Sequence, residues 1–135
     1  IPYAYLAMTR ESIYVKEHKH SPFVTVQPGE GEYLFVYPFV KTVEWYLLPF
    51  EKRQEMMNEH FKVGHEFPTV RINTTYSFGL DDQEFVVAFE SDSPFDFQNL
   101  VMRLRETEAR RYTLRDTPIF TCLKRPIEEI LTSLV

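Results

Sequence analysis

His60 is the residue of this chain whose surroundings most favour ligand chemistry. It lies near the middle of a predicted helix, and its helix face also carries Met56, Met57, Val63 and Gly64. An imidazole on an apolar face with a glycine beside it suits a flat macrocycle, and imidazole is a standard axial ligand of haem iron. A lone histidine on such a face is also often a buried, hydrogen-bonded core residue. The motifs elsewhere in the chain must therefore decide between the two readings.

Two other sets of reactive side chains compete with this site. His60 and His65 are five residues apart and do not share a helix face, and neither an HExxH motif nor a cysteine pair completes a zinc site. His65 is more simply a solvated or interface residue. Cys122 is the single cysteine and lies in the apolar run 119–123, where it is more simply a small core residue than a nucleophile.

The composition suits one domain of 135 residues with a large core, since 44% of the residues are hydrophobic and 16% are aromatic. The net charge of -5 and the absence of a basic run with interleaved aromatics argue against nucleic acid as a partner. No apolar stretch has the length of a membrane span. One cysteine excludes a disulfide framework and makes a reducing cytoplasm the simplest compartment.

The hydrophobic pattern predicts a ferredoxin-like α+β fold. Strands are expected at 3–15, 33–40, 70–78, 84–90 and 117–123, and helices at 49–66, 94–104 and 126–134. From residue 33 the order is β-α-β-β-α-β followed by a helix, which is the split βαβ arrangement. One such unit leaves one sheet face apolar and must pair with a second sheet. Residues 1–32 therefore suggest the last strand of a preceding repeat plus a loop or linker, and 33–135 a complete repeat.

Four motifs in order resemble the chlorite dismutase superfamily. They are YPFVK at 37–41, EWYLLP at 44–49, MMNEH at 56–60 and SFGLDDQEF at 77–85. The resemblance runs from about residue 33 to 121, nearly the whole C-terminal half of a family subunit. The branch it resembles most is the peroxide-dependent haem synthases, or coproheme decarboxylases, of the actinobacterial type. The chain begins with Ile1 rather than methionine, which fits either a fragment or a subunit without its front half.

The resemblance implies a barrel of two ferredoxin-like repeats, of which 33–135 is the haem-binding one. It implies coproheme (iron coproporphyrin III) or haem b as the bound group, hydrogen peroxide as co-substrate, and a homo-oligomer, most simply a pentamer. The family's functional positions fall on His60 as the iron ligand, Tyr37 as the catalytic tyrosine, Lys41 as the basic residue beside a propionate, and Trp45 at the haem edge. The distal base falls on His20, with His18 as a near substitute.

Two departures from the family pattern separate its branches. Chlorite-degrading members place an arginine over the distal face of the iron, and that position is Ile72 here; Arg71 next to it should point to the opposite face of its strand. Those members also place a glutamate against the proximal histidine, and that position falls on Ala109, with Glu108 one residue away. Both departures resemble the decarboxylases, in which Ile72 and Met57 would line the substrate site.

The side chains suit the chemistry that the resemblance implies. A neutral His60 would bind iron on one side, and His20, with an unperturbed pKa near ~6.5, would accept a proton from peroxide on the other. A Tyr37 radical would remove hydrogen from a propionate β-carbon, loss of carbon dioxide would leave a vinyl group, and Lys41 would hold a propionate. Two rounds convert coproheme to haem b. The alternatives are chlorite degradation, haem carriage without turnover, and a cofactor-free ferredoxin-like dimer.

Overall fold

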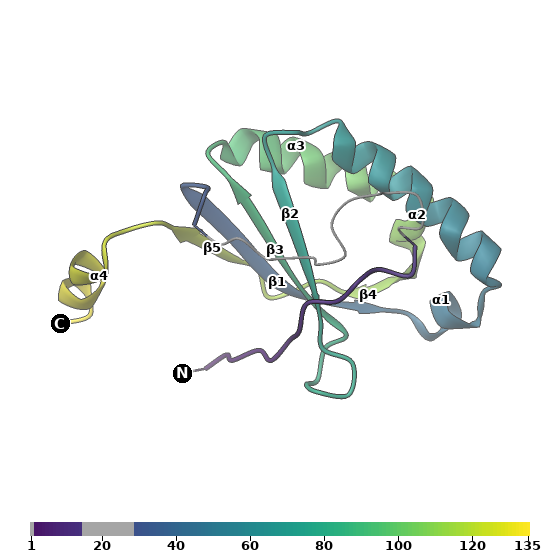
Figure 1. Cartoon of the computed structure of the whole chain (residues 1–135), viewed down its shortest axis with the longest axis horizontal. Helices are drawn as coiled ribbons and strands as arrows, with labels where there is room; N and C mark the ends of the chain where they lie inside the picture. Colours follow the sequence, from purple (N-terminus) through teal and green to yellow (C-terminus); the bar gives the residue numbers. More distant parts are fainter. Residues whose placement is uncertain (1, 15–28) are drawn as a thin grey trace.

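A five-stranded antiparallel sheet organises the molecule (Figure 1). The computed structural model describes residues 2–14 and 29–135. The strands are β1 (Tyr33–Lys41), β2 (Arg71–Tyr76), β3 (Phe85–Ser91), β4 (Thr113–Arg115) and β5 (Phe120–Leu123). Their order is β2-β3-β1, with β4 and β5 both pairing to the other edge of β1. The predicted ferredoxin-like α+β order is confirmed.

The main helices cover one face of this sheet, as Figure 1 shows for α2 and α3. The helical segments are α1 (Val43–Leu47), α2 (Phe50–His65), α3 (Pro94–Arg105), the short 3-10 helix η1 (Glu108–Tyr112) and α4 (Ile127–Ser133). Helix α4 lies at the end of the chain, away from the helices that cover the sheet. Within residues 2–14 and 29–135 no helix combines the length and apolar character that crossing a membrane requires.

Local capping explains where the helices begin and end. The Thr42 hydroxyl accepts a hydrogen bond from the Trp45 amide and starts α1 directly after β1. Leu48 is extended because the residue before a proline avoids the helical region, so α1 stops and α2 begins after Pro49. Ser93 caps α3 by accepting from the Asp96 amide, as its position before Pro94 predicts. The first predicted helix is thus correct, with an additional turn before it.

β1 presents two different surfaces to the helices along its length. Side chains alternate along a strand, so Phe35, Tyr37, Phe39 and Lys41 share one face. Phe35 stacks on Phe97 of α3, with ring centroids 3.9 Å apart, and belongs to the buried core. The following residues on this face line a cavity instead. The sheet therefore supplies a packed core at one end of β1 and a hollow at the other.

Three sequence predictions differ from the structure. The predicted strand at 3–15 is wrong for the described part, because only Met8 pairs with the sheet, at Tyr76, the last residue of β2. The predicted last strand at 117–123 is β5, which begins only at Phe120, and the short strand β4 before it was not predicted. Cys122 is exposed in the described chain rather than part of the core.

Candidate functional site

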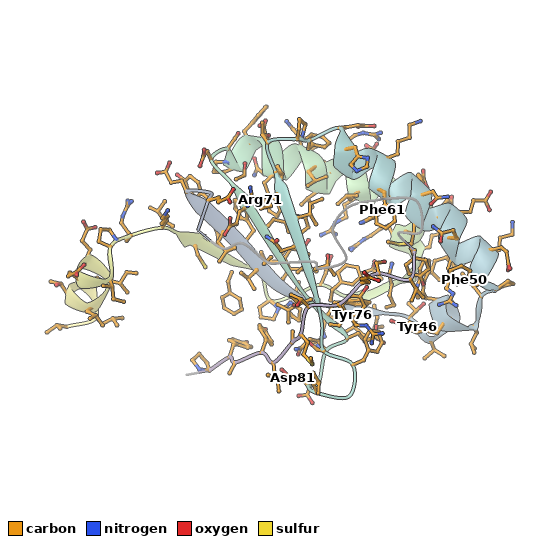
Figure 2. All side chains as sticks on the ribbon, in the orientation of Figure 1. Tyr46, Phe50, Phe61, Arg71, Tyr76 and Asp81 are labelled. Carbon is orange, nitrogen blue, oxygen red and sulfur yellow. The ribbon has the colours of Figure 1, made fainter. Side chains whose placement is uncertain are left out.

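One cavity of about 160 Å³ lies between the sheet and the helices and opens to solvent. Sites for small molecules and cofactors are concave and mostly apolar, as the lining of this cavity is. Its walls come from β1, β2 and β3 on one side and from α2, α3 and η1 on the other. The sequence-predicted residues that line it are Tyr37, Lys41, Met57, His60, Ile72 and Ala109. Figure 2 shows side chains of the sheet and of the helices filling the space between the two layers.

His60 enters this cavity from α2. Met57, His60 and Gly64 are three and four residues apart, so they lie on one helix face, and all three line the cavity. Val63 points into the core instead. Burial, followed by the nearby Lys41 charge, lowers the pKa of His60 to about 4. Because this pKa is low, the imidazole is neutral near pH 7. Its ring makes no hydrogen bond with a described residue, so a ring nitrogen is able to coordinate a metal.

Gly64 brings α2 close to the sheet beside His60. A Cβ at this position would lie 3.3 Å from Cδ1 of Ile72, a tight contact across the cavity. Both residues line the cavity, and Ile72 is 43% exposed. Glycine costs stability in a helix interior, so its presence here needs another reason. Glycine at this position lets the Ile72 side chain approach α2 closely beside His60.

Tyr37 carries a buried phenol on the sheet side of the cavity. Its ring lies 5.8 Å from that of Phe89 and nearly parallel to it. Burial raises the pKa of Tyr37 well above its usual value, and the Asp116 charge raises it further. Arg105 and Arg110 act in the opposite direction. Because its pKa is raised, Tyr37 is a neutral phenol near pH 7. Its hydroxyl makes no hydrogen bond with a described residue, so the O–H is available to a ligand.

Lys41 supplies a positive charge at the end of β1. Its Nζ lies 4.3 Å from the ring centre of Trp45 and donates a long hydrogen bond of 3.5 Å to the Ala109 carbonyl. Burial lowers the pKa of Lys41 to about 8, although Glu84 opposes the shift. Glu84 also fixes this strand end, because its Oε1 accepts from the Lys41 amide at 2.7 Å and from the Tyr46 hydroxyl at 2.8 Å. Tyr46, labelled in Figure 2, lies on α1.

Trp45 is not a wall of the cavity. It is 2% exposed, and its ring packs against those of Tyr14 and Tyr112, with centroids 6.2 and 5.7 Å away. Its link to the site is the cation–π contact with Lys41. The structure therefore places Trp45 behind Lys41, as support for the ammonium group.

The two positions that distinguish the family's branches face the cavity as predicted. Ala109 is buried in its wall, whereas Glu108 is exposed and pairs with Arg111, with 2.9 Å between Nε and Oε2. Arg71, which is labelled in Figure 2, is the first residue of β2. It pairs with Glu30 outside the cavity. The neighbouring Ile72 faces inward. Of the two neighbouring residues, Ala109 is therefore the one in the wall of the cavity.

Three charged cavity residues were not predicted from the sequence. Arg105, Arg110 and Asp116 come from the end of α3, from η1 and from the segment after β4. They have no common spacing, so no local pattern brings them together. The predicted distal bases His18 and His20 lie outside the described residues. Among the residues that are described, no group of three or more His, Cys, Asp or Glu side chains is arranged to hold a metal ion.

Comparisons with known proteins agree with this geometry. The family model for chlorite dismutase matches residues 1–125. The coproheme decarboxylase of Mycolicibacterium smegmatis is 39% identical over 115 residues, which are 85% of this chain and 50% of that protein. The coproheme decarboxylase of Staphylococcus saprophyticus is 41% identical over 88 residues, 60% of this chain and 35% of that protein. The chain thus spans half or less of the length of these curated relatives.

A solved structure extends the match to three dimensions. The chlorite dismutase from Candidatus Nitrospira defluvii, in complex with imidazole, is similar with a TM-score of 0.73 and 33% identity. The match covers 79% of this chain and 46% of that one. The likeness therefore includes most of the described sheet and helices and, again, about half of the larger chain.

The low pKa of His60 predicts a pH dependence of folding stability. Unfolded histidine titrates near ~6.5, so between about pH 4 and 6.5 the unfolded chain binds the proton that folded His60 refuses. The free energy of unfolding should rise with pH across this window, by up to about 3 kcal/mol, and level off above it. His60→Gln should remove this rise. Urea denaturation at a series of pH values measures it, and equal slopes in both proteins would contradict the assignment.

Proposed function

Because this chain belongs to the chlorite dismutase family, we propose that it forms the site at which coproheme is decarboxylated to haem b at the expense of hydrogen peroxide. One observation carries the proposal: Tyr37, Lys41 and His60 line the same cavity. Tyr37 would supply a redox-active phenol, Lys41 a cation and His60 an axial ligand. The reaction needs these three groups around an iron porphyrin that bears propionates. The 39% identity to a coproheme decarboxylase supports the same choice.

The cavity suits a porphyrin in its chemistry. His60 would hold the iron from α2, next to Gly64 and Ile72 in the cavity wall. Iron porphyrin supplies the one-electron oxidation chemistry that amino-acid side chains lack. Apolar walls from Phe85, Val87 and other residues exclude water from the ring. The bound group in this proposal is coproheme as substrate and haem b as product.

The protein's own residues would direct the chemistry to one propionate at a time. Each round is a two-electron oxidation: a propionic acid side chain and one hydrogen peroxide give a vinyl group, one carbon dioxide and two waters. Tyr37 would remove a hydrogen atom from the propionate, which requires a phenol that enters the round with its proton, as burial ensures. Lys41 would hold a propionate carboxylate by a charge-assisted hydrogen bond. We assign the proton-accepting role on the other side of the iron to His20.

Two cavity positions favour decarboxylation over chlorite degradation. Ile72 stands where the chlorite-degrading branch would have an arginine, and Ala109 where it would have a glutamate. An apolar group at position 72 offers no positive charge to a small anion. The structural likeness to a chlorite dismutase keeps that activity as the second candidate.

We propose that the chain acts as part of a larger assembly. Residues 33–135 would be the haem-binding repeat and 1–32 the end of a preceding one, since the matched residues make up only half or less of the relatives. A homo-oligomer, most simply a pentamer, would follow from the family resemblance. The tests below use the chain as given, and size-exclusion chromatography with light scattering reports its assembly state.

The proposed activity predicts a defined change in porphyrin mass. Coproheme bound to the chain and titrated with hydrogen peroxide should lose carbon dioxide and two hydrogens twice in succession, ending as haem b. Mass spectrometry of the extracted porphyrin follows both steps. Porphyrin that stays unchanged while chlorite yields dioxygen would establish the second candidate instead.

Substitution of Tyr37 separates turnover from porphyrin binding. Tyr37→Phe keeps the buried ring and removes the oxidisable hydroxyl, so carbon dioxide release should fall to the background level while the coproheme dissociation constant changes by less than about threefold. Tyr33→Phe is the matched control, since Tyr33 lies on the same strand but is not a wall of the cavity. Product analysis of both variants decides. Undiminished turnover in Tyr37→Phe would argue against the radical role.

Gly64→Ala should change folding and porphyrin binding in opposite directions. An alanine in the helix interior stabilises the fold by roughly 0.5–1 kcal/mol relative to glycine, partly offset by the 3.3 Å contact with the mobile end of Ile72. The added methyl narrows the gap beside His60, so coproheme affinity should fall by about tenfold. Urea denaturation and Soret titration measure the two effects. Undiminished affinity would mean that the porphyrin does not enter between α2 and β2.

A further inference from the structure

Asp116 joins two arginines at the wall of the cavity. Its Oδ2 accepts a hydrogen bond from Nη1 of Arg110 at 2.6 Å, and Nη2 of Arg105 lies 3.2 Å from the same oxygen. The Asp116 side chain is only 15% exposed. All three residues line the cavity that contains Tyr37 and His60. The cluster thus places one carboxylate and two guanidinium groups where a ligand would meet them.

This one carboxylate accepts from only a few of the N–H donors that the two arginines carry. A guanidinium has five N–H donors and binds a carboxylate best through two parallel hydrogen bonds. Here both arginines share one oxygen atom, and neither makes another ion pair or hydrogen bond with a described residue. The cluster carries a net charge of +1. It therefore has both the donors and the charge to take a second carboxylate.

The cluster lies near Tyr37. Among the charges that act on the Tyr37 hydroxyl, Asp116 is the largest, followed by Arg105 and Arg110. The charge of Arg110 also lowers the pKa of Lys41. A ligand carboxylate bound by the two arginines would therefore be close to the phenol that the proposed function makes the oxidant.

On the basis of the proposed function, we propose that Asp116 is a specificity-determining residue that competes with the reactive propionate for Arg105 and Arg110. Before binding, Asp116 supplies the counter-charge that two partly buried guanidinium groups require. The propionate of the substrate then shares or replaces that contact. Once the carboxyl group of the propionate has left as carbon dioxide and a vinyl group remains on the ring, Asp116 pairs with both arginines again. Asp116 thus weakens substrate binding. In the product complex it keeps the two arginines paired with a carboxylate.

A binding measurement tests this without turnover. Trp45 is the only tryptophan, so quenching of its fluorescence reports porphyrin binding. Asp116→Asn should tighten the binding of coproheme, which has four propionates, by roughly tenfold. Haem b has two propionates and lacks the reactive ones, so its dissociation constant should change by less than about twofold. Glu108→Gln removes the same charge from an exposed position outside the cavity and should change neither.

Further variants make the result decisive. Asp116→Glu keeps the carboxylate and should keep the wild-type ratio of the coproheme and haem b affinities. Circular dichroism shows whether Asp116→Asn folds. If it does not, Asp116→Ser is a second neutral variant. Equal tightening for both porphyrins would show a general charge effect and overturn the proposal. Unchanged or weaker coproheme binding would also overturn it. A wild-type chain that binds neither porphyrin would overturn the proposed function as well, which separates the two failures.

Discussion

The site depends on the alternation of side chains along β1. Because every second residue faces the helices, the packing of Phe35 against Phe97 at one end fixes which residues face them at the other. Tyr37 and Lys41 consequently enter the cavity, and a shift of one residue would bury Pro38 and Val40 there instead. Glu84 secures the far end through the Lys41 amide, just before α1 begins. The phenol and the ammonium group are therefore positioned by a rigid strand.

Burial in the cavity then sets the charge of each group. Removal from water disfavours every ionised form, so it lowers the pKa of His60 to about 4 and that of Lys41 to about 8, and raises that of Tyr37. The result near pH 7 is a neutral imidazole opposite a neutral phenol, with Lys41 still mostly charged. The same desolvation makes unpaired arginines costly, which explains why Asp116 lies between two of them.

The sequence predicts what local rules determine. β1, α2 and α3 were predicted almost to the residue, because the hydrophobic period and the helix-start signals at Pro49 and Ser93 act within a few positions. The strand at 3–15 was wrong because a strand also needs a partner edge, which residue-level pattern does not show. Arg105, Arg110 and Asp116 escaped prediction for a similar reason, since three separate elements bring them together. His60 and Tyr37 were found through motifs whose spacing the fold keeps, and their proposed roles rest on that resemblance.

The difference between alanine and glutamate beside His60 has a chemical consequence under the proposed function. A carboxylate bonded to the second ring nitrogen would make the imidazole a stronger donor to iron. Glu108 is next to the required position but is exposed and paired with Arg111, and Ala109 fills the wall. The charge that acts on His60 is instead the positive one of Lys41, which disfavours proton and metal binding alike. Under the proposed function, His60 would thus be a weakly donating ligand, suited to holding a porphyrin that must leave as product.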